Sequence, residues 1–161
     1  SDTPHGPFTD RSYDSPLLSV WSIDSCCLVD GSDLYLYYAS GGAVWVRKLV
    51  DPLTVDTSVP ARKCVTPDVP WEGSVNEGPY VIKRGGIYYM LYSGNGAHTA
   101  DYGVGVAWAT HPRGPWTKQE PPYNPVFARN DAIGLWGPGH GSPVIGPDGV
   151  SEGSPTMSSH Q

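Results

Sequence analysis

A repeated unit of strand, tight turn and tyrosine-rich strand constrains this chain more than any other feature of its sequence. The first copy is SIDSCCLVDGSDLYLYYAS, from Ser22 to Ser40, and the second is NEGPYVIKRGGIYYMLYS, from Asn76 to Ser93. Gly and Asp at the turns, between apolar and aromatic runs, are typical of β-hairpins. A third copy begins with GHGSPVIGPDGV, from Gly139 to Val150. We therefore expect successive antiparallel hairpins, with few helices.

Further strands are predicted between the hairpins. The segments AVWVRKL, from Ala43 to Leu49, and YGVGVAWA, from Tyr102 to Ala109, combine β-branched and aromatic residues. A second repeat supports the same period, because SDTPHGPFTD at residues 1–10 and ATHPRGPWTK at residues 109–118 share the order of Pro, Gly-Pro, aromatic residue and Thr. A period of about 50 to 60 residues with about four strands per unit is typical of a β-propeller. The predicted fold class is all-β, with propeller blades.

Composition agrees with this interpretation and excludes several classes of partner. Twenty Gly and seventeen Pro among 161 residues indicate frequent turns, whereas ten Tyr, six Trp and two Phe argue against disorder. Ten Lys and Arg, scattered among sixteen Asp and Glu, form no basic surface for nucleic acid. No apolar run reaches the length of about 18 residues that a membrane span requires. We therefore expect neither nucleic acid nor a membrane as a partner.

The three cysteines are not expected to carry chemistry. Cys26 and Cys27 are adjacent, so on a strand they point to opposite faces. Three thiols cannot all pair within one chain. We expect all three, including Cys64, to be buried as small apolar side chains.

Two carboxylates and one histidine are the candidate site residues. Asp24 lies eleven residues before Tyr35, and Glu77 lies eleven residues before Tyr88, which predicts equivalent positions on successive blades. His140 stands in the corresponding place before the third turn. Equivalent positions on the inner strands of a propeller converge on its central channel. Two carboxylates in one polar pocket suit acid–base cleavage of a glycosidic bond, although both carboxylates in a simpler interpretation only cap turns.

These segments resemble glycoside hydrolase family 43. WEGSVNEGPY (Trp71 to Tyr80), followed by IYYMLYSGNG, is similar to the blade that carries the general acid of that family. The first hairpin resembles the blade with a supporting Asp, and GPGHGSPVIGPDG (Gly137 to Gly149) resembles the segment that places a His in the channel. The resemblance implies a five-bladed β-propeller, of which this chain supplies about three blades. It also implies an inverting glycosidase for α-L-arabinofuranosides or β-D-xylosides of plant oligo- and polysaccharides.

The resemblance assigns a role to each matching residue. Glu77 matches the general acid, and its neighbour Glu72 is the competing candidate. Asp24 matches the residue that orients the acid and raises its pKa, because a nearby like charge disfavours ionisation. His140 matches a substrate-side channel residue that in some members lies beside a bound Ca²⁺; the alternative is a neutral His without metal. No cofactor is expected to be required.

Two tryptophans are predicted to bind substrate together with the channel histidine. Trp21 and Trp71 flank the two carboxylate motifs and are placed to stack on a sugar ring. The alternative for either residue is packing within a blade.

The residue that activates water is the part of the family pattern that the sequence does not match. Family 43 carries this Asp near the N-terminus, whereas the chain opens with SDTPHGPF, which is similar to the end of a blade. The alternative function is therefore a carbohydrate-binding or catalytically inactive propeller piece, and sucrose- and fructan-cleaving five-bladed enzymes are a related option. We expect residues 1–150 to form the glycosidase-like domain and residues 151–161 to form a polar tail without a strand. Because open sheet edges pair with other chains, we expect a homo-oligomer that completes the propeller.

Overall fold

Antiparallel hairpins account for nearly all regular structure in the part of the chain that is described. The computed structural model describes residues 1, 3–10, 14–145 and 151–154. Its strands are β1 (Ile23–Asp30), β2 (Asp33–Ser40), β3 (Ala43–Asp51), β4 (Thr54–Val55), β5 (Arg62–Val65), β6 (Asn76–Arg84), β7 (Ile87–Gly94), β8 (Gly103–Ala109), β9 (Thr117–Lys118), β10 (Ser142–Ile145) and β11 (Ser151–Ser154). The helical elements among the described residues are two short 3-10 helices, η1 (Pro70–Glu72) and η2 (Asp131–Ile133). Neither helix is long and apolar enough to cross a membrane. The all-β prediction is confirmed.

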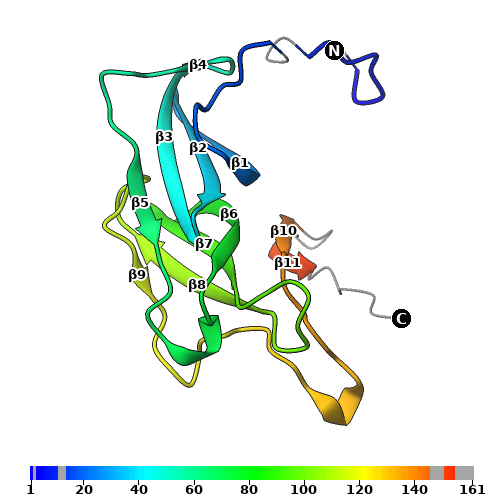
Figure 1. The fold of residues 1–161 in the computed structure, drawn as a ribbon. Helices are drawn as coiled ribbons and strands as arrows, with labels where there is room; N and C mark the ends of the chain where they lie inside the picture. Colours follow the sequence, from blue (N-terminus) through cyan, green and yellow to red (C-terminus); the bar gives the residue numbers. More distant parts are fainter. Residues whose placement is uncertain (2, 11–13, 146–150, 155–161) are drawn as a thin grey trace.

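The strands form two blade-like sheets and a separate hairpin (Figure 1). The first sheet has the order β1-β2-β3-β4, with β5 also paired to β3, and the second has the order β6-β7-β8-β9. Both predicted hairpins close through two-residue turns, Gly31-Ser32 and Gly85-Gly86. The third hairpin is β10-β11, and its predicted turn at residues 147–149 lies outside the described residues.

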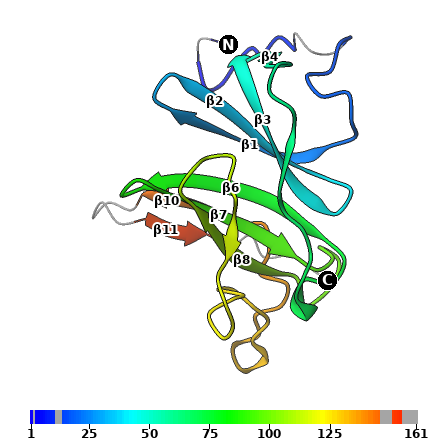
Figure 2. The same ribbon diagram turned by 90° about the vertical axis from the view of Figure 1, so that its left-hand side faces the viewer.

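The two sheets pack face to face around an aromatic core (Figure 2). Its buried side chains are Leu28, Tyr35, Tyr37, Val44, Val46 and Val65 from the first sheet and Val81, Tyr88, Met90, Tyr92 and Ala107 from the second. Tyr37 is fully buried, and its hydroxyl donates a hydrogen bond to the carbonyl oxygen of Pro112 at 2.6 Å. Since a buried hydroxyl needs a partner, this bond lets a tyrosine fill the core without an unpaired polar group.

The outer face of the first sheet is also covered. Leu36, Tyr38 and Leu49 form a second buried cluster, against which Leu17 and Leu18 of the N-terminal segment pack. Residues 35–39 of β2 are therefore buried without interruption, as in a strand with both faces covered.

The spacing to tyrosine predicts the wrong equivalence between the two hairpins. In the strand pairing, Tyr35 lies opposite Leu28, whereas Tyr88 lies opposite Lys83. Both tyrosines are buried in the core between the two sheets. Tyr35 therefore lies on one face of the first sheet, and Tyr88 lies on the opposite face of the second, equivalent sheet. Because adjacent strand residues point to opposite faces, the two tyrosines must differ by one position in register.

Two smaller expectations are also corrected. Residues 151–154, predicted to lie in a strandless tail, form β11 and pair with β10, because backbone groups pair whatever the side chains are. Cys27 is exposed, whereas Cys26 and Cys64 are partly buried, and none of the three forms a disulfide. Cys26 and Cys27 face opposite sides of the edge strand β1, so only one of them reaches the core.

An ion pair joins the turn end of the first sheet to the second sheet. The Asp30 carboxylate accepts hydrogen bonds from the ammonium of Lys83 and from the hydroxyl of Tyr88. Lys83, and then Tyr88, hold the pKa of Asp30 below its ordinary value. A lowered folded-state pKa stabilises the fold above the unfolded-state pKa, and this contribution is lost as the pH falls through the folded-state value.

We therefore expect Asp30→Asn to lower the melting temperature at neutral pH by roughly 1–3 °C, since the pair is partly exposed. The deficit should start to shrink below about pH 4, the ordinary pKa of Asp, and disappear once the pH falls through the lower folded-state pKa of Asp30. Thermal unfolding followed by circular dichroism between neutral and acidic pH measures both effects. Asp33→Asn is the control, because Asp33 pairs with Lys48 of its own sheet. An equal loss in the control, or a deficit that persists in acid, would contradict an inter-sheet role for Asp30.

Candidate active site

The three hairpins share one backbone irregularity on their inner strands. In each hairpin, one residue lies two positions before the regular ladder of hydrogen-bonded pairs. This residue is Asp24 before Cys26, Gly78 before Tyr80, and His140 before the start of β10. All three have positive φ, at 56°, 56° and 51°. The residue of the second hairpin equivalent to Asp24 is therefore Gly78, and Glu77 comes one position earlier. A left-handed conformation is costly for Asp and His, and such strain is typical of functional sites.

These equivalent positions meet in space. The Oδ2 atom of Asp24 accepts a hydrogen bond from the backbone N–H of Gly78 at 3.1 Å. A Cβ atom placed on Gly78 would lie 3.2 Å from Nδ1 of His140, so the imidazole rests directly against the glycine. The convergence predicted for the inner strands is thus confirmed for Asp24 and His140.

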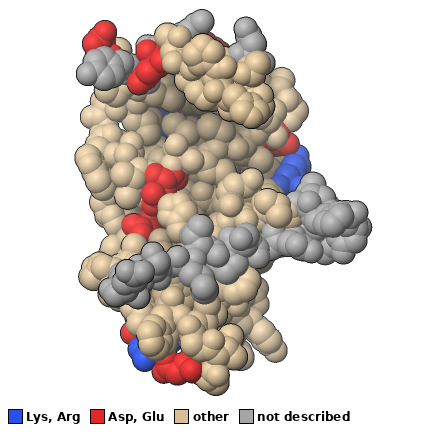
Figure 3. Space-filling view, turned by 90° about the vertical axis from the view of Figure 1, so that its right-hand side faces the viewer, with Lys and Arg blue, Asp and Glu red and all other residues tan. Residues whose placement is uncertain are grey.

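A cavity of about 400 Å³ lies at this meeting point, and we call it the site cavity. It is lined by Asp24, Ser25, Cys26 and Cys27 of β1, by Gly78, Pro79 and Tyr80 of β6, and by His140, Gly141 and Ser142 at the start of β10. Figure 3 shows acidic side chains near the middle of the face on which β10 and β11 lie. The cavity has polar groups from three separate hairpins.

Glu77 lies beside the site cavity and is not part of its lining. Its half-buried side chain accepts a hydrogen bond at Oε1 from the hydroxyl of Tyr102, at 2.9 Å. Burial raises the pKa of Tyr102, and the negative charges of Glu77 and Asp24 raise it further. The Tyr102 hydroxyl therefore stays protonated at neutral pH and acts as a donor to the carboxylate.

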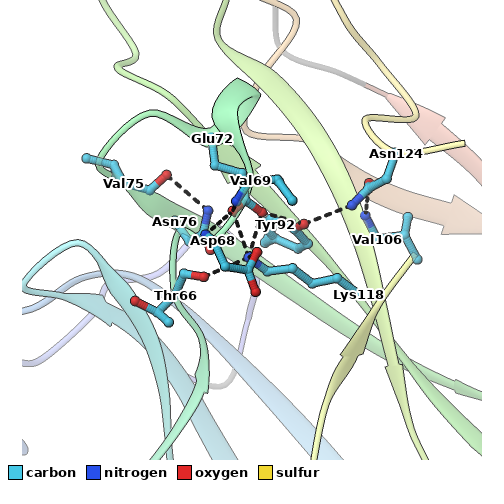
Figure 4. A network of polar contacts seen from close by, with 10 residues as sticks. All are labelled: Thr66, Asp68, Val69, Glu72, Val75, Asn76, Tyr92, Val106, Lys118 and Asn124. Atoms are coloured by element: carbon cyan, nitrogen blue, oxygen red, sulfur yellow. Dashed lines mark hydrogen bonds and ion pairs between the residues drawn. The ribbon is translucent and has the colours of Figure 1, made fainter. Parts of the chain in front are cut away.

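Glu72, the competing candidate for the acid, is engaged in a buried polar network (Figure 4). Its side chain is fully buried, and Nζ of Lys118 lies 2.7 Å from its carboxylate. Oε2 also accepts from the backbone N–H groups of Asp68 and Val69, and Oε1 accepts from the hydroxyl of Tyr92 at 2.8 Å. These contacts hold the strands of the second sheet to η1, so Glu72 is a structural charge.

The two tryptophans occupy different environments. Trp21 is 74% exposed and lines a surface cavity of about 670 Å³ together with Ser25, which also borders the site cavity. Trp71 stacks on Tyr92 with ring centroids 6.0 Å apart and packs against the core. Trp21 thus lies at the edge of the site. Trp71 packs within the blade, which is the alternative to sugar stacking given above.

The described residues do not supply a protein-ligated metal site. Nowhere among them do three or more His, Cys, Asp or Glu side chains form a group that would hold a metal ion. Ca²⁺ takes about six to eight oxygen ligands, whereas the exposed imidazole of His140 offers only nitrogen atoms. A cation held beside His140 through water stays a prediction.

Three residues of the site were not found from the sequence. Tyr102 is predicted only as the first residue of a strand, and Ser93 only as the last residue of another. Gly139 precedes His140 and lies against the ring of Tyr102. Contacts between segments so far apart leave no local pattern in the sequence.

The sequence is similar to known proteins along most of its length. The sequence profile of the family described as "Glycosyl hydrolases family 43" matches residues 1–152. An extracellular exo-α-(1→5)-L-arabinofuranosidase of Streptomyces avermitilis is 29% identical over 91% of the chain. An α-L-arabinofuranosidase 43 of Humicola insolens is 30% identical over 83% of the chain.

Solved structures extend the comparison to the fold. The crystal structure of an endo-1,4-β-xylanase from Bacteroides thetaiotaomicron aligns with 95% of the chain at a TM-score of 0.86 and 35% identity. A thermostable family-43 glycoside hydrolase aligns with 92% of it at a TM-score of 0.81 and 32% identity. These similarities confirm the propeller-type fold. The chain spans about half of those two structures, 54% and 52%, and about a third of the two curated relatives, 32% and 30%.

The buried pair of Glu72 and Lys118 yields a stability prediction. Lys118→Met leaves the Glu72 carboxylate buried without its cation, so we expect a loss of about 3–5 kcal/mol in the free energy of unfolding. Urea unfolding measures this loss. Lys48→Met, which breaks a partly exposed pair with Asp33, is the control and should cost at most about 1 kcal/mol. Equal losses in the two variants would show that the buried network does not stabilise the fold.

Cys27 yields a second prediction, which tests the exposure of the site cavity. Burial raises the pKa of Cys26 and raises that of Cys64 to about 12, so both thiols should react slowly at neutral pH. A thiol reagent such as 5,5′-dithiobis(2-nitrobenzoate) should therefore label Cys27 first. Cys27→Ser should remove the fast phase, and its persistence in that variant would contradict the assignment.

Proposed function

The chain belongs to glycoside hydrolase family 43, and from this membership we propose that it acts on α-L-arabinofuranosidic or β-D-xylosidic bonds of plant polysaccharides or oligosaccharides. The proposed reaction is hydrolysis by an inverting acid–base mechanism. The similar arabinofuranosidases and the similar xylanase support a pentose-containing carbohydrate as substrate.

One observation carries the proposal: Asp24 and His140, from different hairpins, line one cavity with Glu77 directly beside it. The family resemblance alone assigns these residues from sequence order. Their convergence in space supports a sugar-binding centre, because a pocket with a few converging polar groups is typical of ligand sites. The exposed indole of Trp21 at the edge of the site suits stacking against a sugar ring.

Glu77 is the proposed general acid. Its Oε1 atom is occupied by the hydrogen bond from Tyr102, which leaves Oε2 to carry the proton that the departing glycosidic oxygen accepts. Asp24 is the proposed orienting carboxylate, since its Oδ2 holds the backbone N–H of the residue after Glu77. His140 is the proposed contact for substrate hydroxyl groups, because its exposed ring borders the cavity.

A carbohydrate-binding or inactive propeller is the second candidate function. Inversion needs a second carboxylate about 6.5–9.5 Å from the acid to activate water. Among the described residues Asp24 is the one carboxylate that lines the site cavity, and its proposed role is to orient the acid. Sugar binding without turnover would support this second candidate. The homo-oligomer also stays a prediction, which light scattering over a range of concentrations tests.

The acid assignment predicts a large loss of activity. Glu77→Gln keeps the shape of the side chain but removes the transferable proton, so turnover of natural pentosides should fall by about 10²–10⁴. Aryl glycosides with acidic phenol leaving groups need less protonation and should lose less. Steady-state kinetics on arabino-oligosaccharides, xylo-oligosaccharides and nitrophenyl pentosides measures the contrast.

Glu120→Gln is the matched control, because Glu120 is exposed and lies outside the site cavity. Glu72 is unsuitable as a control, since its replacement would disturb the buried network. The acid assignment fails if Glu77→Gln keeps full activity on natural substrates or if the control is equally damaged.

A further inference from the structure

We propose that Tyr102 and Ser93 position the general acid and connect it to the loop that carries His140. This inference rests on the proposed role of Glu77 and adds two positioning residues to it. Three observations carry it: a donor bond from Tyr102 to the acid, a close contact between Tyr102 and the loop, and a hydrogen bond from the loop to Ser93.

Tyr102 is fixed where it contacts the acid. It is only 3% exposed, and its hydroxyl lies 2.9 Å from Oε1 of Glu77. It directly precedes β8, whose first residue, Gly103, pairs with Gly94 at the end of β7. A buried ring next to a paired strand has little rotational freedom, so its hydroxyl is a fixed point for the carboxylate.

The loop before His140 lies against the ring of the same tyrosine. A Cβ atom placed on Gly139 would lie 1.9 Å from two ring carbons of Tyr102, which no side chain can tolerate. Only glycine permits this approach of backbone to ring. The position of the loop and the position of the ring therefore depend on each other.

Ser93 completes the connection. Its fully buried Oγ accepts a hydrogen bond from the backbone N–H of His140 at 2.7 Å. The Ser93 hydroxyl also lowers the pKa of Tyr102, which makes Tyr102 a stronger donor to Glu77. Ser93 lies opposite Glu77 in the strand pairing of β6 and β7. Ser93 is thus tied to the loop through the N–H of His140, and Tyr102 donates to the acid.

The direction of the hydrogen bond from Tyr102 determines its effect on the acid. A donated hydrogen bond favours the ionised carboxylate, whereas the nearby negative charge of Asp24 disfavours it. Within the described part of the chain, Tyr102 contacts Glu77, Asp24 bonds the backbone of the next residue, Gly78, and the His140 ring lies against that glycine. Loss of the Tyr102 donor and loss of the Asp24 charge should therefore move the ionisation of Glu77 in opposite directions.

The first test measures this ionisation without requiring activity. The chain has four Glu residues, so a protein labelled with ¹³C at the Glu side-chain carboxyl gives few signals, and Glu77→Gln identifies the relevant one. In Tyr102→Phe the titration midpoint of Glu77 should rise by about one pH unit. Ser93→Ala should raise it by less, and Asp24→Asn should lower it.

Tyr35→Phe is the matched control. Tyr35 is equally buried, at 4% exposure, but lies on the first sheet in the core between the sheets. Tyr35→Phe also removes a buried tyrosine hydroxyl, but it should leave the titration midpoint of Glu77 unchanged. An unchanged midpoint in Tyr102→Phe, or an equal change in the control, would overturn the positioning role.

Kinetics separates this inference from the proposed function. If the wild type hydrolyses pentosides, Tyr102→Phe should lower kcat on natural substrates by about tenfold, leave KM nearly unchanged, and move the alkaline limb of the pH–rate profile to higher pH. A wild type without turnover would refute the proposed function, yet the carboxyl titration would still decide whether Tyr102 controls Glu77. Unaltered kcat and pH profile in an active Tyr102→Phe enzyme would refute the inference alone.

Discussion

The left-handed residue at the start of each inner strand is the constraint on which the site depends. The residues with this conformation at the three strand starts are Asp24, Gly78 and His140. Each lies just before its strand enters a regular ladder. For Asp and His this backbone costs about 1–2 kcal/mol, which the surrounding contacts must offset. One such contact is the bond from Gly78 N–H to Asp24, and another is the bond from His140 N–H to Ser93. In β1 and β6 this residue lies where the ladder register shifts, and all three residues line one cavity.

Two glutamates five residues apart show how packing separates structure from chemistry. Glu72 is fully buried and its charge is matched by Lys118, so its carboxylate is committed to holding η1 against the second sheet. Glu77 is half-buried, and the neutral hydroxyl of Tyr102 donates a hydrogen bond to it. A carboxylate with a neutral donor keeps an oxygen for proton transfer, whereas a carboxylate saturated by a cation and several donors does not.

Local sequence predicted the elements well because hairpins are encoded locally. Gly at both turns and apolar runs beside them were enough to place β1, β2, β6 and β7. Register was predicted less well, since Tyr35 and Tyr88 are buried on opposite faces of their sheets and spacing alone carries no information about the face. The pairing of β11 depends on backbone groups, and its polar residues gave no strand signal. The convergence of Asp24 and His140 was predictable only through the repeat, and the buried position of Glu72 only through tertiary contacts.

The glycines beside the site explain why its parts come from different hairpins and still act together. Gly78 lets the imidazole of His140 rest against β6, and Gly139 lets the loop backbone rest against the ring of Tyr102. At each glycine, a neighbouring segment occupies the space that a side chain would fill. The two segments are therefore in close contact, and neither can shift without the other. Two hydrogen bonds add to these contacts: the loop N–H of His140 donates to Ser93, and the hydroxyl of Tyr102 donates to Glu77. Close backbone contact thus fixes the distance between hairpins, and the hydrogen bonds fix the orientation of the carboxylate, which are the two requirements for placing a proton on a substrate oxygen.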